Sequence, residues 1–431
     1  FDYELPGVLS SRVGVGSRVR VPLRNRASTG TVVATSEAEE GSEAAALLKP
    51  IAGLITDQPI LTPSLIELGR WVAEYYVAPM DAVMRSLIPE VVRGENNDFQ
   101  RRLFVRLTGA AGEEDLAKLG RRAKRQASIL SDLMAAEKPV ALASLGSGGR
   151  AAVEGLVKKG FVELTQEIVA RDPHRDEQFV ASRPLKLTDA QGDCLDEINA
   201  AVRDPRSAKP LLLHGVTGSG KTEVYLQAIA AAMDAGCTAL VLVPEISLTP
   251  QTVRRFKSRF ADMQDRVAVL HSHLSGGERF DEWHKIVAGK ARIVIGARSA
   301  LFAPLRNLGL IVVDEEHEGS YKQDSAPRYH ARDVAVVRGS IEGCAVVLGS
   351  ATPSLESFHN TRLGKYQLIE LPDRVDDRSM PLIRIVDMRQ EARNLSKSGG
   401  PAIISERSSR STPFLEKIFT STTVPSIPGG A

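Results

Sequence analysis

Short continuous runs of hydrophobic residues, each followed by a turn and a helical pattern, fill the second half of the chain. The runs cover residues 211–214, 239–243, 267–270, 292–295, 310–313 and 345–348. Apolar runs of this length are typical of parallel strands that are buried on both faces of a sheet. From residue 187 onward the sequence therefore predicts an α/β domain with a parallel sheet.

The amino-terminal part of the chain has a different pattern. Residues 16–22 and 30–33 are short strand-like segments separated by turn residues. Thr62 and Pro63 then predict the start of a helix, as its N-cap and its first residue, and apolar residues recur at helical spacing as far as Tyr75. These features indicate a small β-rich domain that also contains helices.

A third pattern lies between these two regions. It comprises a basic helix over residues 121–134, a connector over 140–145, a second helix over 150–159 and a hairpin-like stretch over 161–169. This order of helix, turn, helix and hairpin favours a winged helix. A generic α+β connector is the alternative interpretation.

The composition is that of an ordinary globular protein, with a formal net charge of only +2. Any affinity for nucleic acid therefore has to come from local clusters of basic residues. The three cysteines, Cys194, Cys237 and Cys344, are widely spaced, so neither a disulfide framework nor a zinc site is expected. No apolar run approaches membrane-spanning length and no signal peptide is recognisable, which favours a reducing cytoplasm.

Residues 215–222 fit the phosphate-binding pattern G-x4-G-K-[ST] in full, between an apolar strand and a helix. Glycines let backbone N–H groups close around phosphates, and the helix N-terminus favours anions. Lys221 is expected to reach the β- and γ-phosphates and the Thr222 hydroxyl to bind Mg²⁺. The predicted nucleotide-binding residues are Gln191, Gly215, Thr217, Gly218, Ser219, Gly220, Lys221, Thr222 and Glu223.

An acidic box, Asp314-Glu315-Glu316-His317, follows a buried strand. Ligands bind at this carboxyl edge in open α/β sheets. Adjacent carboxylates are costly to hold together without a cation, so we expect Asp314 to hold Mg²⁺. Glu315 is expected to orient or deprotonate the attacking water. The predicted catalytic residues are Lys221, Asp314 and Glu315.

Two further segments fit the same site. Gln191 precedes the phosphate loop, and its amide is suited to reading the adenine edge. Residues 349–353, Gly-Ser-Ala-Thr-Pro, follow another predicted strand. The hydroxyls of Ser350 and Thr352, together with His317, are expected to couple the ATP site to a DNA track.

Taken together, these motifs resemble the PriA family of bacterial primosomal replication-restart helicases. The resemblance also rests on residues 243–251, 270–272 and 296–302, and on a loop over residues 320–333 that is similar to the family's aromatic-rich loop. It covers about residues 1–390. It implies a multidomain fold: a β-rich domain at 1–95 that binds the 3′ end of DNA, a winged-helix-like domain at 96–178, and a RecA-like, superfamily 2 ATP-binding lobe of the DEAD/DEAH type at 185–375.

The function implied by the resemblance is ATP-dependent 3′→5′ DNA unwinding at stalled or recombined forks, followed by primosome assembly and reloading of the replicative helicase. The implied cofactors are ATP and Mg²⁺. The implied partners are branched and single-stranded DNA, primosome proteins, single-stranded-DNA-binding protein and the loader of the replicative helicase. The implied location is the cytoplasm and its nucleoid, without a membrane.

The sequence departs from the family at its far end. The family has a second motor lobe, an arginine-bearing motif and a zinc-binding insertion with eight cysteines, so zinc is expected for the family but not for this chain. Residues 376–395 are expected to begin the connection to that lobe, and residues 396–431 to be a disordered tail. Because the chain also begins at Phe1 rather than Met, we expect a fragment that binds DNA without unwinding it. We expect its DNA-binding domains to fold without the motor.

The loop over residues 320–333 interleaves aromatic rings, on which bases stack, with cations that hold phosphates. The predicted DNA contacts are Tyr321, Lys322, Arg328, Tyr329 and Arg332 in this loop, Gln251 and Arg298 elsewhere in the lobe, and Phe1, Asp2, Tyr3 and Lys49 in the amino-terminal domain. The last four match the family's pocket for a DNA 3′ end. Arg24 stands where the family often has glycine. The basic residues 254–259 are expected to form a solvated helix face.

Two other functions stay open at this point. One is a DNA-binding and protein-docking module without turnover, because a single lobe lacks the arginine finger that a partner lobe supplies. The other is the translocating subunit of a restriction enzyme, which shares both boxes. The Phe1-Asp2-Tyr3 segment and the loop over residues 320–333 argue against the second.

Overall fold

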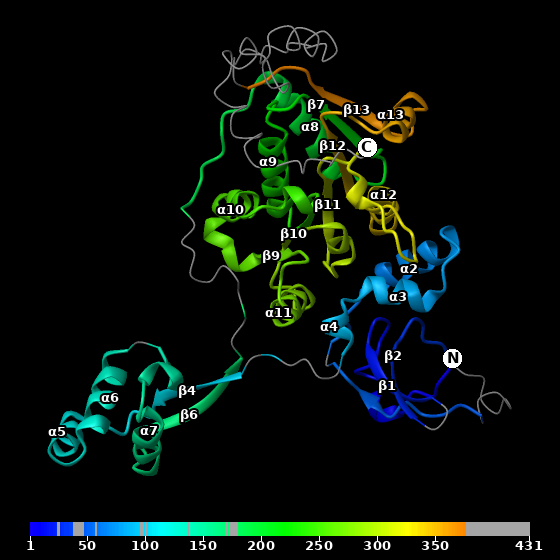
Figure 1. Cartoon of the computed structure of the whole chain (residues 1–431). Helices are drawn as coiled ribbons and strands as arrows, with labels where there is room; N and C mark the ends of the chain where they lie inside the picture. The colour runs from blue at the N-terminus through cyan, green and yellow to red at the C-terminus, as the bar shows by residue number, and fades with distance from the viewer. Residues whose placement is uncertain are drawn as a thin grey trace, which may run out of the picture. The chain divides into compact units, whose positions relative to one another are not determined.

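The computed structural model describes residues 1–23, 26–37, 47–56, 58–94, 99, 101–136, 138–168, 171 and 180–375 (Figure 1). Among these residues, no helix combines the length and the apolar character that crossing a membrane requires. The segments predicted at residues 376–395 and 396–431 lie outside the described residues, and so does Arg24.

The amino-terminal sheet consists of β1 (Arg18–Leu23), β2 (Arg26–Thr31) and β3 (Gly53–Leu54), antiparallel and with β1 in the centre. Val19 and Val21 of β1 point into a small core. The second strand begins at residue 26 rather than at the predicted residue 30. Hydrophobicity does not reveal it, because β2 contains only small and polar residues.

Three helices follow: α2 (Pro63–Tyr75), α3 (Met80–Leu87) and α4 (Glu90–Arg93). The start of α2 is confirmed, because the Thr62 hydroxyl accepts a hydrogen bond from the Leu65 N–H at 3.3 Å. The buried face of α2 packs on α12 (Ala331–Glu342), in one core with residues of the parallel sheet. Part of the core of the amino-terminal region is therefore shared with the ATP-binding lobe.

Residues 101–168 form a three-stranded antiparallel sheet with helices. The elements are β4 (Arg101–Leu107), α5 (Glu113–Arg122), α6 (Lys124–Ala135), β5 (Val140–Ala141), the 3₁₀ helix η2 (Leu142–Leu145), α7 (Gly149–Lys158) and β6 (Val162–Ile168). The helix predicted over residues 121–134 is found as α6, but its first two residues belong to α5, because the backbone of Ala123 (φ −148°, ψ 71°) separates the two helices. The predicted hairpin is wrong. The stretch is the single strand β6, which pairs with β4 from before the helices.

The predicted parallel sheet is confirmed. Seven strands are arranged in the order β13-β7-β12-β11-β8-β10-β9. They are β7 (Leu211–Gly215), β8 (Thr238–Leu242), β9 (Val267–Leu270), β10 (Ile293–Gly296), β11 (Leu308–Val313), β12 (Ala345–Ser350) and β13 (Gln367–Leu371). The sequence pattern missed β13. It is an edge strand whose exposed and buried residues alternate, so it carries no continuous apolar run.

Helices cover both faces of this sheet (Figure 1). Leu211 and Leu213 face a core with α8 (Asp189–Arg203), α9 (Lys221–Asp234) and α10 (Pro250–Arg259). Leu212, between them, faces the opposite core with α11 (Gly276–Val287) and α12. Because the strands are parallel, the carboxyl ends of β7 and β11 lie at the same edge of the sheet, with β12 between them. The lobe ends with α13 (Leu355–Arg362) and β13.

Candidate nucleotide site and nucleic-acid contacts

The phosphate loop over residues 215–222 connects β7 to α9. Gly218 (φ +85°) and Gly220 (φ +83°) have left-handed backbone conformations, which glycine adopts without strain. Gly220 is also the N-cap of α9, so the loop leads directly into a helix N-terminus. The buried Lys221 Nζ donates a hydrogen bond to the Gly215 carbonyl at 2.7 Å, which holds the ammonium across the loop.

Gln191 supports the loop from behind. Its Nε2 donates to the Ser219 carbonyl at 2.8 Å, and its Oε1 accepts from the Thr188 N–H at 2.9 Å. Both ends of the amide therefore bind protein backbone, although the side chain also lines the pocket beside the loop. The contacts in the structure are those of a brace for the loop, whereas the sequence predicted a reader of adenine.

The pocket beside the loop has a volume of about 350 Å³. It is lined by Leu185, Lys186, Gln191, Thr217, Gly218, Ser219, Gly220, Lys221, Thr222, Glu223, Arg255, Asp314, Glu315 and Val375. The structure thus brings most of the predicted nucleotide residues together with both predicted catalytic carboxylates. Arg255 was missed, because its helix was expected to be a solvated face.

Asp314 and Glu315 follow directly after β11. Burial and the neighbouring Glu315 carboxylate raise the pKa of Asp314 to about 6, although the Lys221 ammonium and a hydrogen bond from Tyr225 oppose the shift. The Tyr225 hydroxyl donates to Asp314 Oδ1 at 3.3 Å. Glu315 has a left-handed backbone (φ +45°), an uncommon conformation for a non-glycine residue. Such strain is often found at functional sites.

The donors in this pocket fit a magnesium ion that is held jointly with phosphate oxygens. Mg²⁺ is usually bound by one or two carboxylates together with substrate phosphates rather than by a cage of protein ligands alone. In the part of the chain that the structure describes, no group of three or more His, Cys, Asp or Glu side chains could form such a cage. The Asp314 carboxylate and the Thr222 hydroxyl therefore suit a shared ion.

Glu223 is already engaged within the protein. It forms two hydrogen bonds with the Arg259 guanidinium, at 2.9 and 2.6 Å, and accepts another from the Leu185 N–H at 3.0 Å. Burial works against ionisation, but these hydrogen bonds lower the pKa of Glu223 overall. In the structure Glu223 therefore forms an ion pair that ties α9 to α10, while it also lines the pocket beside the phosphate loop.

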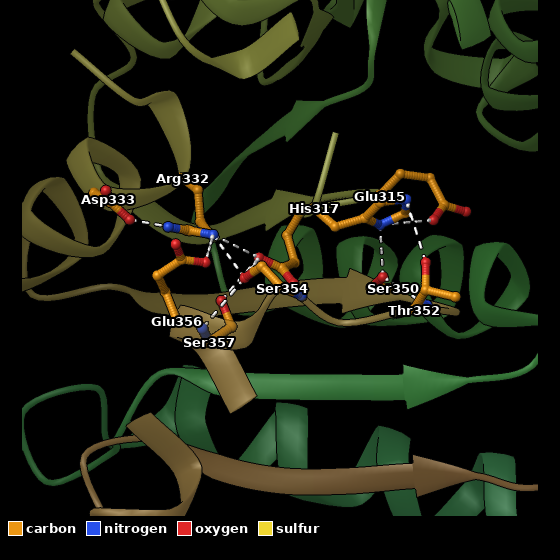
Figure 2. A network of polar contacts seen from close by, with 10 residues as sticks. Glu315, His317, Arg332, Asp333, Ser350, Thr352, Ser354, Glu356 and Ser357 are labelled. Carbon is orange, nitrogen blue, oxygen red and sulfur yellow. Dashed lines mark hydrogen bonds and ion pairs between the residues drawn. The ribbon is translucent and has the colours of Figure 1, made fainter. Parts of the chain in front are cut away.

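The three residues predicted to couple ATP to DNA lie together (Figure 2). His317 Nδ1 lies 2.8 Å from Ser350 Oγ, and His317 Nε2 lies 3.4 Å from Thr352 Oγ1. His317 Nδ1 also lies 3.7 Å from a carboxylate oxygen of Glu315. A chain of polar contacts thus connects the Glu315 carboxylate to the end of β12.

Glu316 forms a second network, which the sequence analysis missed. This carboxylate is fully buried and accepts hydrogen bonds from the Ser354 N–H (2.7 Å), Ser354 Oγ (2.9 Å) and Ser357 Oγ (2.8 Å). Arg332 lies 3.3 Å from it and also contacts Asp333 and Glu356 (Figure 2). Arg332 was predicted to bind DNA, but it is buried among carboxylates, so its charge is used inside the protein.

The aromatic rings of the loop over residues 320–333 point inward. Tyr321 is fully buried, and its hydroxyl donates to the Asp314 carbonyl at 2.7 Å. Tyr329 is 1 % exposed and packs edge-on against Phe302, with 5.2 Å between ring centroids. Neither ring offers a face to a DNA base in this conformation. The prediction of base stacking is thus not supported, because both rings are used to anchor the loop.

The other predicted contacts of the lobe are accessible. Lys322, Arg328 and Gln251 are exposed, and Arg298 is partly exposed. The Arg298 guanidinium donates to the carbonyls of Ser320 (3.2 Å) and Lys322 (2.5 Å). Arg298 therefore braces the loop and does not stand free beside it.

The predicted amino-terminal contacts also lie together. The Glu4 N–H donates to the Lys49 carbonyl at 3.0 Å, and the Ile51 N–H donates to the Glu4 carbonyl at 3.1 Å. This pairing brings the segment that directly follows Phe1, Asp2 and Tyr3 alongside Lys49. Phe1 is fully exposed, so its ring is accessible to a ligand.

Comparison with known proteins supports these two regions separately. The model of a 3′ DNA-binding domain (3′BD) of PriA matches residues 1–89. The model of the DEAD/DEAH box helicase family matches residues 188–361. The chain is 37% identical to the replication restart protein PriA of Bacillus subtilis over 92% of this chain and 57% of that protein.

The chain belongs to the PriA family. The corresponding protein of Chlamydia muridarum is 35% identical over 92% of this chain and 53% of its own length. That of Haemophilus influenzae is 35% identical over 91% and 52%. The chain thus spans about half the length of the curated PriA relatives that it matches. The family is one of helicases, which generally use ATP and Mg²⁺.

Proposed function

We propose that this chain is the DNA-recognition and ATP-binding part of a replication-restart DNA helicase that moves 3′→5′ and acts on stalled or recombined forks. The observation that supports the proposal most directly is the pocket that joins the phosphate loop to Asp314 and Glu315. The match of residues 1–89 to a 3′ DNA-binding domain links this pocket to DNA.

In this proposal the loop N–H groups and Lys221 hold the β- and γ-phosphates. The Thr222 hydroxyl and the Asp314 carboxylate hold Mg²⁺, which neutralises phosphate charge when it is bound. Glu315 orients the attacking water and accepts its proton. His317, which contacts Glu315, Ser350 and Thr352, transmits a change in the charge of the Glu315 carboxylate to the end of β12. Lys221 also favours the ionised form of Asp314, which binding a cation requires.

The DNA contacts are proposed to come from three regions. Residues 1–3 with Lys49 bind a DNA 3′ end, and residues 101–168 act as a winged-helix-like module. In the ATP-binding lobe, Gln251, Lys322 and Arg328 contact DNA phosphates, and Arg298 holds the loop in place. Primosome proteins, single-stranded-DNA-binding protein and a helicase loader are the partners that the family suggests.

For the isolated chain we propose DNA binding without unwinding. Transfer of the γ-phosphoryl group requires an opposing arginine, which in two-lobed motors comes from the second lobe. A gel-shift assay with a forked duplex, run beside a strand-displacement assay with ATP, tests both parts. We expect a shifted complex and no displaced strand. ATP-dependent displacement would refute the second part, and absence of any complex would refute the first.

A further inference from the structure

Helix α2, which packs on the ATP-binding lobe through α12, ends in a group of aromatic rings. We name this group, Trp71, Tyr75 and Tyr76, the aromatic ledge. The Trp71 and Tyr75 rings stack with 4.7 Å between centroids and 14° between planes. Tyr76 meets both rings edge-on, at 6.2 and 5.0 Å. Trp71 and Tyr76 pack partly against the shared core, whereas Tyr75 is 65 % exposed. The outermost ring of the ledge therefore presents much of its surface to solvent.

The turn that follows the ledge has a strained backbone. α2 ends at Tyr75, and Val77 has a left-handed backbone (φ +47°) and is 91 % exposed. Helices commonly end on glycine in this conformation, and a β-branched residue there is an outlier. The Ala78 N–H nevertheless bonds to the Ala73 carbonyl at 2.9 Å, so the turn is closed. Backbone strain of this kind is concentrated at functional sites.

The ledge is attached to the loop over residues 320–333. The Tyr76 hydroxyl accepts a hydrogen bond from the His330 N–H at 3.2 Å, and the Lys322 ammonium lies 5.6 Å from the Tyr76 ring centroid. Lys322 Nζ also donates to the Arg328 carbonyl at 2.6 Å. The exposed Lys322 thus stands over one ring of the ledge, and the exposed Arg328 lies in the same loop, where its Nε donates to the Asp324 carbonyl at 3.1 Å. Aromatic faces beside cations are the usual construction of a single-strand binding track, where bases stack and phosphates pair.

We infer that Tyr75, backed by Trp71, stacks a base of single-stranded DNA, while Lys322 and Arg328 hold the adjacent phosphates. This inference rests on the proposed DNA-binding function and assigns to the ledge the stacking role that the buried Tyr321 and Tyr329 do not fill. A protein partner fits the ledge less well, because Tyr75 and Val77 are the large apolar side chains of the ledge and its turn that are mostly exposed, which is a small area for a protein interface. A single base has the size and the π-face that the ledge offers.

The two tryptophans of the chain make the test direct. Trp283 is 1 % exposed, so quenching of tryptophan emission by an added oligonucleotide reports on Trp71. A thymidine oligonucleotide of about 20 residues should quench this emission, and an abasic strand of the same length, with the same phosphates but no bases, should not. The quenching should disappear in Trp71→Phe.

Affinity provides an independent measurement with the full chain. Fluorescence anisotropy should show that Tyr75→Ala binds the thymidine strand about fivefold or more weakly, the lower limit for loss of one stacked base, with affinity for the abasic strand unchanged. Tyr75→Phe keeps the ring and should bind like wild type. Leu363→Ala, which truncates another exposed apolar residue, is the matched control.

Equal affinity of wild type and Tyr75→Ala for the thymidine strand would overturn the inference, and so would an equal loss on both strands. A change in oligomeric state of Tyr75→Ala without DNA, seen by sedimentation, would overturn it in favour of contact between copies of the chain. All of these outcomes leave the proposed function intact. Absence of any DNA binding by the wild-type chain would instead refute that function.

Discussion

Replacing Asp314 with Asn should make the ligand-free protein more stable at neutral pH while weakening its binding of Mg²⁺ with ATP. Burial and the adjacent Glu315 raise the pKa of Asp314 from 3.8 to about 6, so the ionised form is disfavoured in the folded state. Asn has a similar shape and no charge, and its oxygen can still accept the hydrogen bond from Tyr225. The substitution removes the cost of the buried charge together with the ligand for Mg²⁺.

The size of the effect follows from the shift in pKa. A rise from 3.8 to about 6 corresponds to at most about 3 kcal/mol, at about 1.4 kcal/mol for each pH unit. Because the folded-state pKa of Asp314 is raised, its favourable contribution is complete below the unfolded pKa of about 4 and is lost as the pH rises through about 6. The two proteins should therefore be similar in stability near pH 4 and differ most above about pH 7.

Urea unfolding in EDTA, repeated between about pH 4 and pH 8, measures this difference. The unfolding free energy of Asp314→Asn should exceed that of wild type by up to about 3 kcal/mol at pH 8. Mg²⁺ with ATP should narrow the gap by stabilising wild type alone. Glu356→Gln, which neutralises a carboxylate with a side chain 71 % exposed, is the control and should change little. A difference that does not vary with pH, or an Asn variant that is less stable at pH 8, would refute the reasoning.

Four further predictions concern other parts of the site. Lys221→Ala should abolish binding of a fluorescent ATP analogue while forked-DNA affinity in a gel shift stays within about twofold, because the ammonium lies in the nucleotide pocket and is hydrogen-bonded to the phosphate loop. In the intact two-lobed protein, Glu315→Gln should retain ATP on a filter without releasing phosphate, and normal turnover would remove Glu315 from its role. Arg332→Ala should lower the unfolding free energy, measured by urea unfolding, by about 3–5 kcal/mol, because it leaves the Glu316 carboxylate buried without its cation. A loss of less than about 1 kcal/mol would contradict this expectation. DNA affinity should fall steeply between about 50 and 200 mM salt in anisotropy titrations if phosphates dominate, and a flat salt dependence would argue against phosphate contacts.

The geometry of the candidate nucleotide site was predictable because local sequence determines it. A glycine-rich turn between a strand and a helix determines the path of residues 215–222, and β11 delivers Asp314 whatever packs around it. The strands from β7 to β12 were predictable for the same reason, since each is a continuous apolar run. The edge strand β13 alternates and was missed.

Where the structure departs from what the sequence suggested, the cause is a partner far away in the chain. Tyr329 looked like an exposed aromatic residue of a charged loop, and its burial comes from Phe302 and from the core that α2 shares. Arg332 was predicted to contact DNA, but in the structure its guanidinium donates hydrogen bonds to Glu316 and Ser354. Residues 161–169 looked like a hairpin because β4, their real partner, lies more than fifty residues earlier. Local patterns carry no information about such pairings.

The core shared by α2 and α12 has a consequence for anyone who divides this protein. A fragment that ends near residue 95 carries the DNA-binding sheet but exposes the apolar side chains of Leu65, Leu68 and Val72, which are fully buried in the intact chain. A fragment that begins after residue 95 leaves Val334 and Ala335 of α12 uncovered. The end of the family match at residue 89 therefore does not coincide with a boundary between two separate hydrophobic cores. Chimaeras that exchange the first 89 residues between relatives should exchange the facing side of α12 as well.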